Sequence, residues 1–100
     1  MRKQPINGGG WFDLDKAKYY EEDSYFDGSN NISEATHDQW THEGLYRTAS
    51  GAWVLWSWSQ WQGTRDRYTL VSTKDAARWL VQNDEPIPAE LASEVEAAEV

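Results

Sequence analysis

The sequence predicts a single α+β domain, an antiparallel meander of three to five strands with one helix packed on one face. Two observations predict this class. Three strand-like segments joined by short turns follow one another in the middle of the chain, and a segment with helical periodicity comes next. A chain of 100 residues is long enough to bury one modest core. We place the domain at residues 11–84.

The first ten residues, MRKQPINGGG, show no periodicity and end in three glycines. We therefore predict a flexible arm over residues 1–10. Its two basic residues are not followed by an apolar run, so it lacks the pattern of a signal peptide. No stretch approaches the roughly 18 apolar residues of a membrane span, and the chain has no cysteine. These features predict a cytoplasmic protein with no membrane partner.

The segment that follows the arm predicts a first strand and a turn. Tyr19 and Tyr20 favour a strand over residues 17–25, because aromatic side chains are enriched in strands. The sequence DGSNN at residues 27–31 then has the composition of a turn.

Clearer strand signals begin at residue 39. The sequence QWTHEGLYRT predicts a strand over 39–48, and the run WVLWSWSQW lies in a second strand over 52–61. The residues at 49–51 supply the turn of this hairpin. A further turn at 62–64 leads to a third strand over 66–72.

A helix is predicted over residues 73–83, and it should cover one face of the meander. Ser72 or Thr73 can cap its first turn, and Pro86 and Pro88 prevent its continuation. One stripe of the helix is apolar and carries Ala76, Ala77, Leu80 and Val81, with Trp79 at its border.

Residues 85–100 are predicted to form an acidic tail. The segment 84–100 holds six acidic residues and no basic residue. The tail either forms a short second helix, through Leu91, Val95 and Ala98, or frays.

The four tryptophans between residues 53 and 61 divide evenly between the two faces of a strand, because successive side chains point to opposite faces. Ser57 and Ser59 make one face more polar, so we expect that face, with Trp53 and Trp61, to be partly open. In the alternative, all four are packed against the helix, the N-terminal strand or a second copy. If the face with Trp53 and Trp61 is the open one, the helix covers the opposite face, which carries Val54, Trp56 and Trp58.

The net charge of −8 is unevenly distributed, and its distribution bears on the partner. Residues 44–83 carry a local charge of +3, from five basic and two acidic residues, between two acidic segments. A chain with this overall charge repels phosphate, which disfavours nucleic acid. Cations beside an open aromatic face make that face the candidate binding site. The candidate binding residues are Trp53, Trp61, Arg47, Arg65, Arg67 and Tyr68.

Candidates for catalysis and metal binding are few. His37 or His42 could serve as a general acid or base with a nearby Asp or Glu. Their five-residue spacing puts them on opposite faces of one strand, which argues against a shared metal. The acidic turn matches a calcium loop poorly, because Tyr25 occupies a ligand position. We predict no catalytic constellation, no metal and no cofactor.

The run LYRTASGAWVLWSWSQWQG at residues 45–63, followed by VSTKDAARWLVQND, resembles a group of small uncharacterised bacterial proteins encoded on chromosomes, plasmids and other mobile elements. The resemblance covers roughly residues 40–84 and departs at Trp56-Ser57-Trp58, where fewer aromatic residues are expected. It implies no particular activity or ligand. The association with mobile elements implies a protein that binds another protein and inhibits or neutralises it.

The leading functional prediction is a non-enzymatic, acidic protein-binding module, such as an inhibitor or an antitoxin-type or anti-defence regulator. A protein partner is expected, with a homodimer through the aromatic face as a further option. One alternative is a ligand- or nucleic-acid-binding domain that uses an exposed Trp face. The other is a small enzyme that uses His37 or His42.

Overall fold

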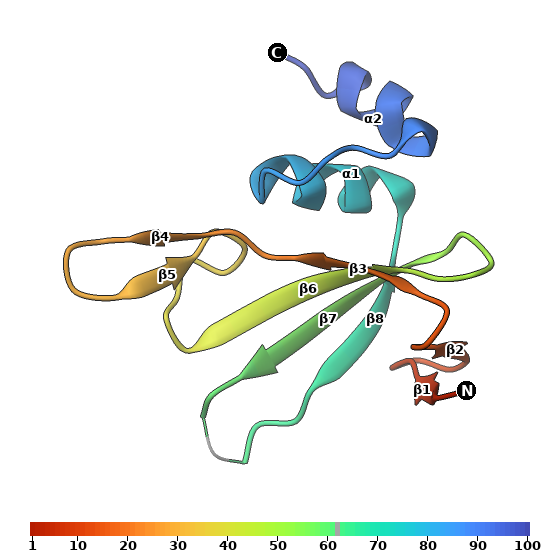
Figure 1. The fold of residues 1–100 in the computed structure, drawn as a ribbon, viewed down its shortest axis with the longest axis horizontal. Helices are drawn as coiled ribbons and strands as arrows, with labels where there is room; N and C mark the ends of the chain where they lie inside the picture. The colour runs from red at the N-terminus through yellow and green to blue at the C-terminus, as the bar shows by residue number, and fades with distance from the viewer. Residues whose placement is uncertain (62) are drawn as a thin grey trace.

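The computed structural model describes residues 1–61 and 63–100 and confirms the α+β class. Helix α1 packs on one face of a four-stranded antiparallel sheet, and helix α2 lies on the far side of α1 (Figure 1). The strands of this sheet, in spatial order, are β3 (Lys18–Glu21), β6 (Thr41–Arg47), β7 (Trp53–Ser59) and β8 (Arg67–Val71).

The predicted meander is β6–β7–β8, and each strand end lies within two residues of its predicted position. In the β6–β7 hairpin Leu45 lies opposite Leu55. Gly51 takes a φ of 91° in the connecting turn, a backbone region that favours glycine. Of the turn predicted at 62–64, Gln62 lies outside the described residues.

The single strand predicted over 17–25 is two strands. β3 belongs to the main sheet, whereas β4 (Ser24–Phe26) pairs with β5 (Asn31–Ser33) in a hairpin that projects from the sheet (Figure 1). The chain leaves the sheet at Asp23, whose backbone N–H donates to Asn83 Oδ1 at 3.0 Å. The predicted turn forms over residues 27–30, with Asn31 already in β5, and the Asp27 carboxylate accepts two backbone N–H groups at 2.8 Å.

The prediction of a flexible arm over residues 1–10 is wrong. β1 (Lys3–Pro5) and β2 (Trp11–Asp13) form a hairpin, so the boundary placed at residue 11 falls inside one element. The three glycines at 8–10 all have positive φ and build its turn rather than a linker. This N-terminal hairpin packs on the sheet face opposite α1, where Phe12 is 4% exposed. Two hydrogen bonds also join it to β8. The Asn7 backbone N–H donates to Tyr68 O at 2.7 Å, and the Tyr68 backbone N–H donates to Asn7 Oδ1 at 2.9 Å.

Helix α1 (Thr73–Gln82) forms as predicted, with Ser72 as its cap; Ser72 Oγ accepts the Asp75 N–H at 3.1 Å. The predicted apolar stripe needs one correction. Trp79 is buried, whereas Val81 is exposed, because the sheet lies on the Trp79 side of the helix. The core between α1 and the sheet consists of Tyr20, Leu45, Trp53, Ala76, Ala77, Trp79, Leu80 and Leu91.

The acidic tail is helical rather than frayed. A 3₁₀ turn (Ala89–Leu91) leads into α2 (Ala92–Ala97). Leu91 is fully buried in the main core and Val95 packs against it, as the apolar pattern of the tail predicted. Of the three apolar residues named for this helix, Ala98 is exposed.

The expected orientation of β7 is wrong. Trp53 packs under α1 at 2% exposure, and Val54 is buried on the opposite face under the N-terminal hairpin. From Leu55 to Ser59 every residue is only partly buried. On both faces of the sheet, the side chains at the start of β7 are buried and those toward its end are more exposed. Burial therefore depends on the position along β7, and not only on which face a side chain occupies.

Candidate binding surface

The six predicted binding residues do not form one site. Trp53 belongs to the core, which removes it as a surface anchor. Arg47 lies opposite Trp53, and its guanidinium is already engaged by the Glu90 carboxylate through two hydrogen bonds, one of them 2.9 Å between Nη2 and Oε2. Arg65 and Arg67 are exposed near the other end of the sheet.

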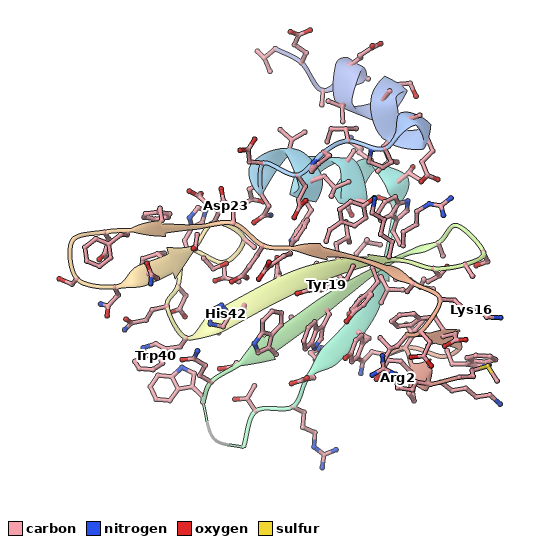
Figure 2. All side chains as sticks on the ribbon, viewed as in Figure 1. Arg2, Lys16, Tyr19, Asp23, Trp40 and His42 are labelled. Atoms are coloured by element: carbon pink, nitrogen blue, oxygen red, sulfur yellow. The ribbon has the colours of Figure 1, made fainter. Side chains whose placement is uncertain are left out.

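Trp61 is exposed as predicted, and it has a partner that sequence analysis did not single out. Trp40, just before β6, stacks at a tilt against Trp61 with ring centroids 5.4 Å apart. The chain segments are joined by a hydrogen bond from Gln60 N to Trp40 O at 2.8 Å. The two residues remain 41% and 59% exposed, so this Trp pair is an open aromatic surface at the end of the β6–β7 hairpin away from its turn. Figure 2 labels Trp40 at this end of the sheet.

A second aromatic group crosses the sheet on the face opposite α1, and we call it the aromatic ladder. The ring of Trp58 stacks between His42, at 5.4 Å, and Trp56, at 4.1 Å. Trp56 then stacks on Tyr68 at 5.9 Å, with the rings 2° from parallel. Since these rings face one another, the ladder has few free ring faces on which a base or sugar could stack. Tyr68, a predicted binding residue, is thus a half-buried member of this ladder.

The ladder is held in place at the β8 end and on the side of β3. Trp56 Nε1 donates to Asp66 Oδ2 at 3.1 Å. Tyr19 lies across Gly44, where a Cβ would come within 2.5 Å of the Tyr19 ring (Figure 2). Burial, followed by the neighbouring Tyr46, raises the pKa of Tyr19 to about 12, so this phenol stays neutral.

His42 is engaged in a structural network. Its Nδ1 donates to Glu22 Oε2 at 2.6 Å, while Glu22 Oε1 accepts from Ser33 Oγ at 2.8 Å and from Glu43 N at 2.6 Å. His42 Nε2 is buried and has no hydrogen-bond partner among the described residues. An imidazole with one nitrogen bonded and the other shielded from solvent has no atom free for proton transfer to a substrate.

Across the described residues, the side chain of the second candidate histidine, His37, is not part of this network of hydrogen bonds. His37 is exposed in the turn between β5 and β6, with a φ of 58°. Within residues 1–61 and 63–100, no group of three His, Cys, Asp or Glu side chains is placed to hold a metal ion.

An acidic region adjoins the Trp pair. Residues 19–46 contain seven acidic residues and no Lys or Arg, and they include the projecting β4–β5 hairpin. Phe26, which is 66% exposed, and Tyr25 add aromatic surface to that hairpin. Glu22 and Glu43 are largely buried, whereas the other five acidic residues are at least partly exposed, and Asp38 Oδ1 accepts from Trp40 N at 3.0 Å. We call these five residues the acidic flank of the Trp pair.

No protein-family model, curated protein or solved structure matches this chain. None of the helices in the described part of the chain is long and apolar enough to cross a membrane.

Proposed function

We propose that this protein is a non-enzymatic protein-binding module whose Trp pair and acidic flank bind a basic surface of another protein. The observation that carries the proposal is the exposed contact between Trp40 and Trp61. Trp is the side chain most enriched among the residues that dominate binding energy at interfaces, and here two of them stand together with open surface.

The charge distribution supports a basic partner. No Lys or Arg lies between residues 19 and 46, and five of the acidic residues there keep exposed or partly exposed side chains beside the Trp pair: Glu21, Asp23, Asp27, Glu34 and Asp38. Complementary potentials speed association and select the partner, and salt screens them. The same charge disfavours nucleic acid itself. We infer an inhibitor-type regulator that covers a basic, nucleic-acid-binding surface of a cytoplasmic target, in keeping with the lack of cysteine.

Three features argue against the alternatives. The self-stacked ladder leaves few ring faces for a base or sugar, and His42 has no free nitrogen for acid–base chemistry. The exposed His37 has no ion pair with an Asp or Glu among the described residues. A protein surface can use the edges of such rings together with the two open tryptophans, because shape-complementary packing does not require a free ring face.

The test compares capture of protein partners from an extract of the native organism by the wild-type chain and by the double variant Trp40→Ala, Trp61→Ala. We expect the variant to fold and to lose at least about tenfold in affinity for the captured partner, the scale of removing interface anchors. Higher salt should weaken capture by the wild-type chain.

The matched control is Trp11→Ala, which removes an exposed Trp from the N-terminal hairpin, away from the Trp pair. This variant should retain the partner. Retention of the partner by the double variant, or capture of nucleic acid instead of protein, would contradict the proposal.

A further inference from the structure

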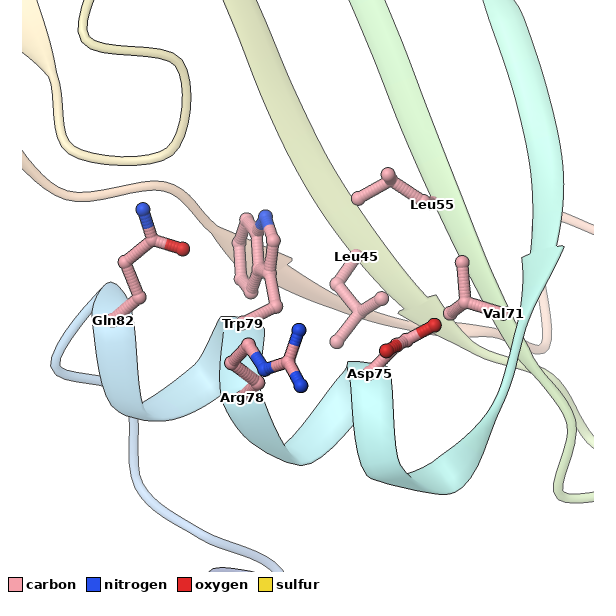
Figure 3. Close-up of a pocket in the computed structure, with 7 residues that line it drawn as sticks. All are labelled: Leu45, Leu55, Val71, Asp75, Arg78, Trp79 and Gln82. Atoms are coloured by element: carbon pink, nitrogen blue, oxygen red, sulfur yellow. The ribbon is translucent and has the colours of Figure 1, made fainter. Parts of the chain in front are cut away.

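A cavity of about 230 Å³ lies between helix α1 and the sheet, on the face away from the aromatic ladder. The cavity is open to solvent on one side, so a single aliphatic side chain can lie in it with one side still in water. Its lining, shown in Figure 3, consists of Leu45, Leu55, Val71, Asp75, Arg78, Trp79 and Gln82.

The inner surface of the cavity is apolar. Leu45 and Trp79 belong to the buried core, and Leu55 and Val71 are half-buried beside them. The Trp79 indole is fixed, because its Nε1 donates to Glu43 Oε1 at 3.1 Å. Because Leu45 and Trp79 are already almost fully covered, a ligand side chain would contact mainly Leu55, Val71 and the edge of Trp79, and would leave water on that side.

The mouth of the cavity carries one cation and one anion. Asp75 and Arg78 are three residues apart on α1 and extend from the side of the helix that faces the cavity (Figure 3). Both are exposed, and across the described residues neither takes part in an ion pair within 4.0 Å. Each therefore has its charge available to a ligand.

We propose that this cavity binds a free α-amino acid with an apolar side chain. The side chain would pack against Leu55, Val71 and Trp79, the carboxylate would pair with Arg78, and the ammonium group with Asp75. A ligand with a carboxylate alone is repelled by Asp75, and one with an amine alone is repelled by Arg78. A zwitterion satisfies both charges at once. This site lies on α1 and does not depend on the Trp pair.

The experiment is a titration of the isotope-labelled protein followed by NMR, with the Trp79 indole N–H resonance as the readout. L-leucine should shift this resonance saturably, with a dissociation constant of about 1 mM for so small a ligand in a half-open site. Leucinamide and N-acetyl-leucine each lack one charge and should bind about fivefold more weakly, the upper range for an exposed ion pair. Glycine, which lacks the apolar side chain, should cause no saturable shift.

Two exposed-site variants test the roles of the charges. Arg78→Gln and Asp75→Asn should each weaken leucine binding by about fivefold. Lys74→Gln is the control, because Lys74 is charged and lies on α1 but does not line this cavity. Their NMR spectra also report whether each variant is folded. Absence of a saturable shift with leucine, equal binding of glycine, or unchanged affinity in both charge variants would overturn the proposal.

Discussion

Glu22 illustrates how much of this fold depends on one side chain. Its carboxylate receives hydrogen bonds from His42, Ser33 and the Glu43 backbone, and so connects the end of β3 with β5 and β6. These bonds attach the projecting β4–β5 hairpin to the main sheet. Because the carboxylate and the imidazole are both largely buried, the bonds are formed with little competition from water.

Replacing Glu22 by Gln should destabilise the protein by about 2 to 3 kcal/mol, because the new amide either faces the Nδ1–H donor of His42 or forces the imidazole proton onto Nε2, which is buried without a partner among the described residues. Chemical denaturation by urea measures the loss. The control is Glu21→Gln, an exposed neighbour with no side-chain hydrogen bond in the described structure, which should change stability by less than about 0.5 kcal/mol. Equal effects of the two variants would show that the network contributes little.

Glu43 gives a prediction about pH. Burial raises the pKa of this carboxyl above its ordinary value, the Trp79 hydrogen bond lowers it, and the charge of Glu22 raises it further. With the folded pKa above the unfolded one, the folded state holds its proton to higher pH. This residue therefore makes the protein less stable as the pH rises through that interval.

The variant Glu43→Gln removes this titration and keeps an oxygen acceptor for Trp79. It should be more stable than the wild-type protein at neutral pH, with the difference shrinking as the pH falls to the ordinary pKa of a glutamate. Urea denaturation at several pH values tests this. A stability difference that does not change with pH would mean that folding does not raise the pKa of Glu43.

Among the elements, the N-terminal hairpin is the largest departure from the sequence-based expectation. Phe12 packs on Tyr46 and Tyr68, with ring centroids 5.4 and 6.0 Å away, and it covers Val54. The N-terminal hairpin thus covers one face of the sheet, as α1 covers the other.

Phe12→Ala should cost about 3 to 5 kcal/mol of stability, the usual range for removing a buried Phe. Thermal or urea denaturation measures it. The adjacent residue provides the control, since Trp11 is 52% exposed and Trp11→Ala should have a small effect. A harmless Phe12→Ala would restore the flexible-arm interpretation.

The contrast between β7 and the N-terminal hairpin shows what could be predicted from the sequence. The meander, α1 and its Ser72 cap follow from local periodicity and turn chemistry, and all three are found. The burial of Trp53 does not follow from the sequence. The alternation of side chains along β7 defines two faces, but it does not say whether the helix or the N-terminal hairpin packs on a given face, or how much of the strand that element covers. The glycines at 8–10 suit a tight turn and a linker equally well, and only the burial of Phe12 distinguishes them.

The candidate site was predictable only in part for the same reason. Trp61 was expected at the surface, whereas Trp40 acquires its role by contact with a residue 21 positions away in the chain. Arg47 was expected near Arg65 and Arg67, but it lies toward the opposite end of the sheet and pairs with Glu90 of the tail. Neither relationship has a local sequence signal.

As a whole the molecule is flat, with principal extents of 40 × 39 × 21 Å. Its radius of gyration of 14.2 Å exceeds the roughly 13 Å typical of a compact chain of this length. The excess reflects the open end of the sheet and the projecting β4–β5 hairpin (Figure 1). Both the Trp pair and the acidic flank lie on these outlying parts, where a partner can reach them.

At this scale the net charge of −8 predicts a monomer at low ionic strength, because two copies repel each other. Sedimentation analysis at low and high salt checks this expectation. A stable dimer at low salt would instead support the use of the aromatic surface between two copies of the chain.

The two hydrogen bonds between Asn7 and Tyr68 also bear on how the protein behaves at high concentration. β8 is an edge strand, and an edge strand with unpaired backbone groups is a template for aggregation with other chains. Asn7 occupies the outward-facing groups of Tyr68 and so shields that edge near the start of β8. A chain that lacks the first fourteen residues would lose this protection together with the cover of Val54, and we expect it to aggregate more readily than the full chain.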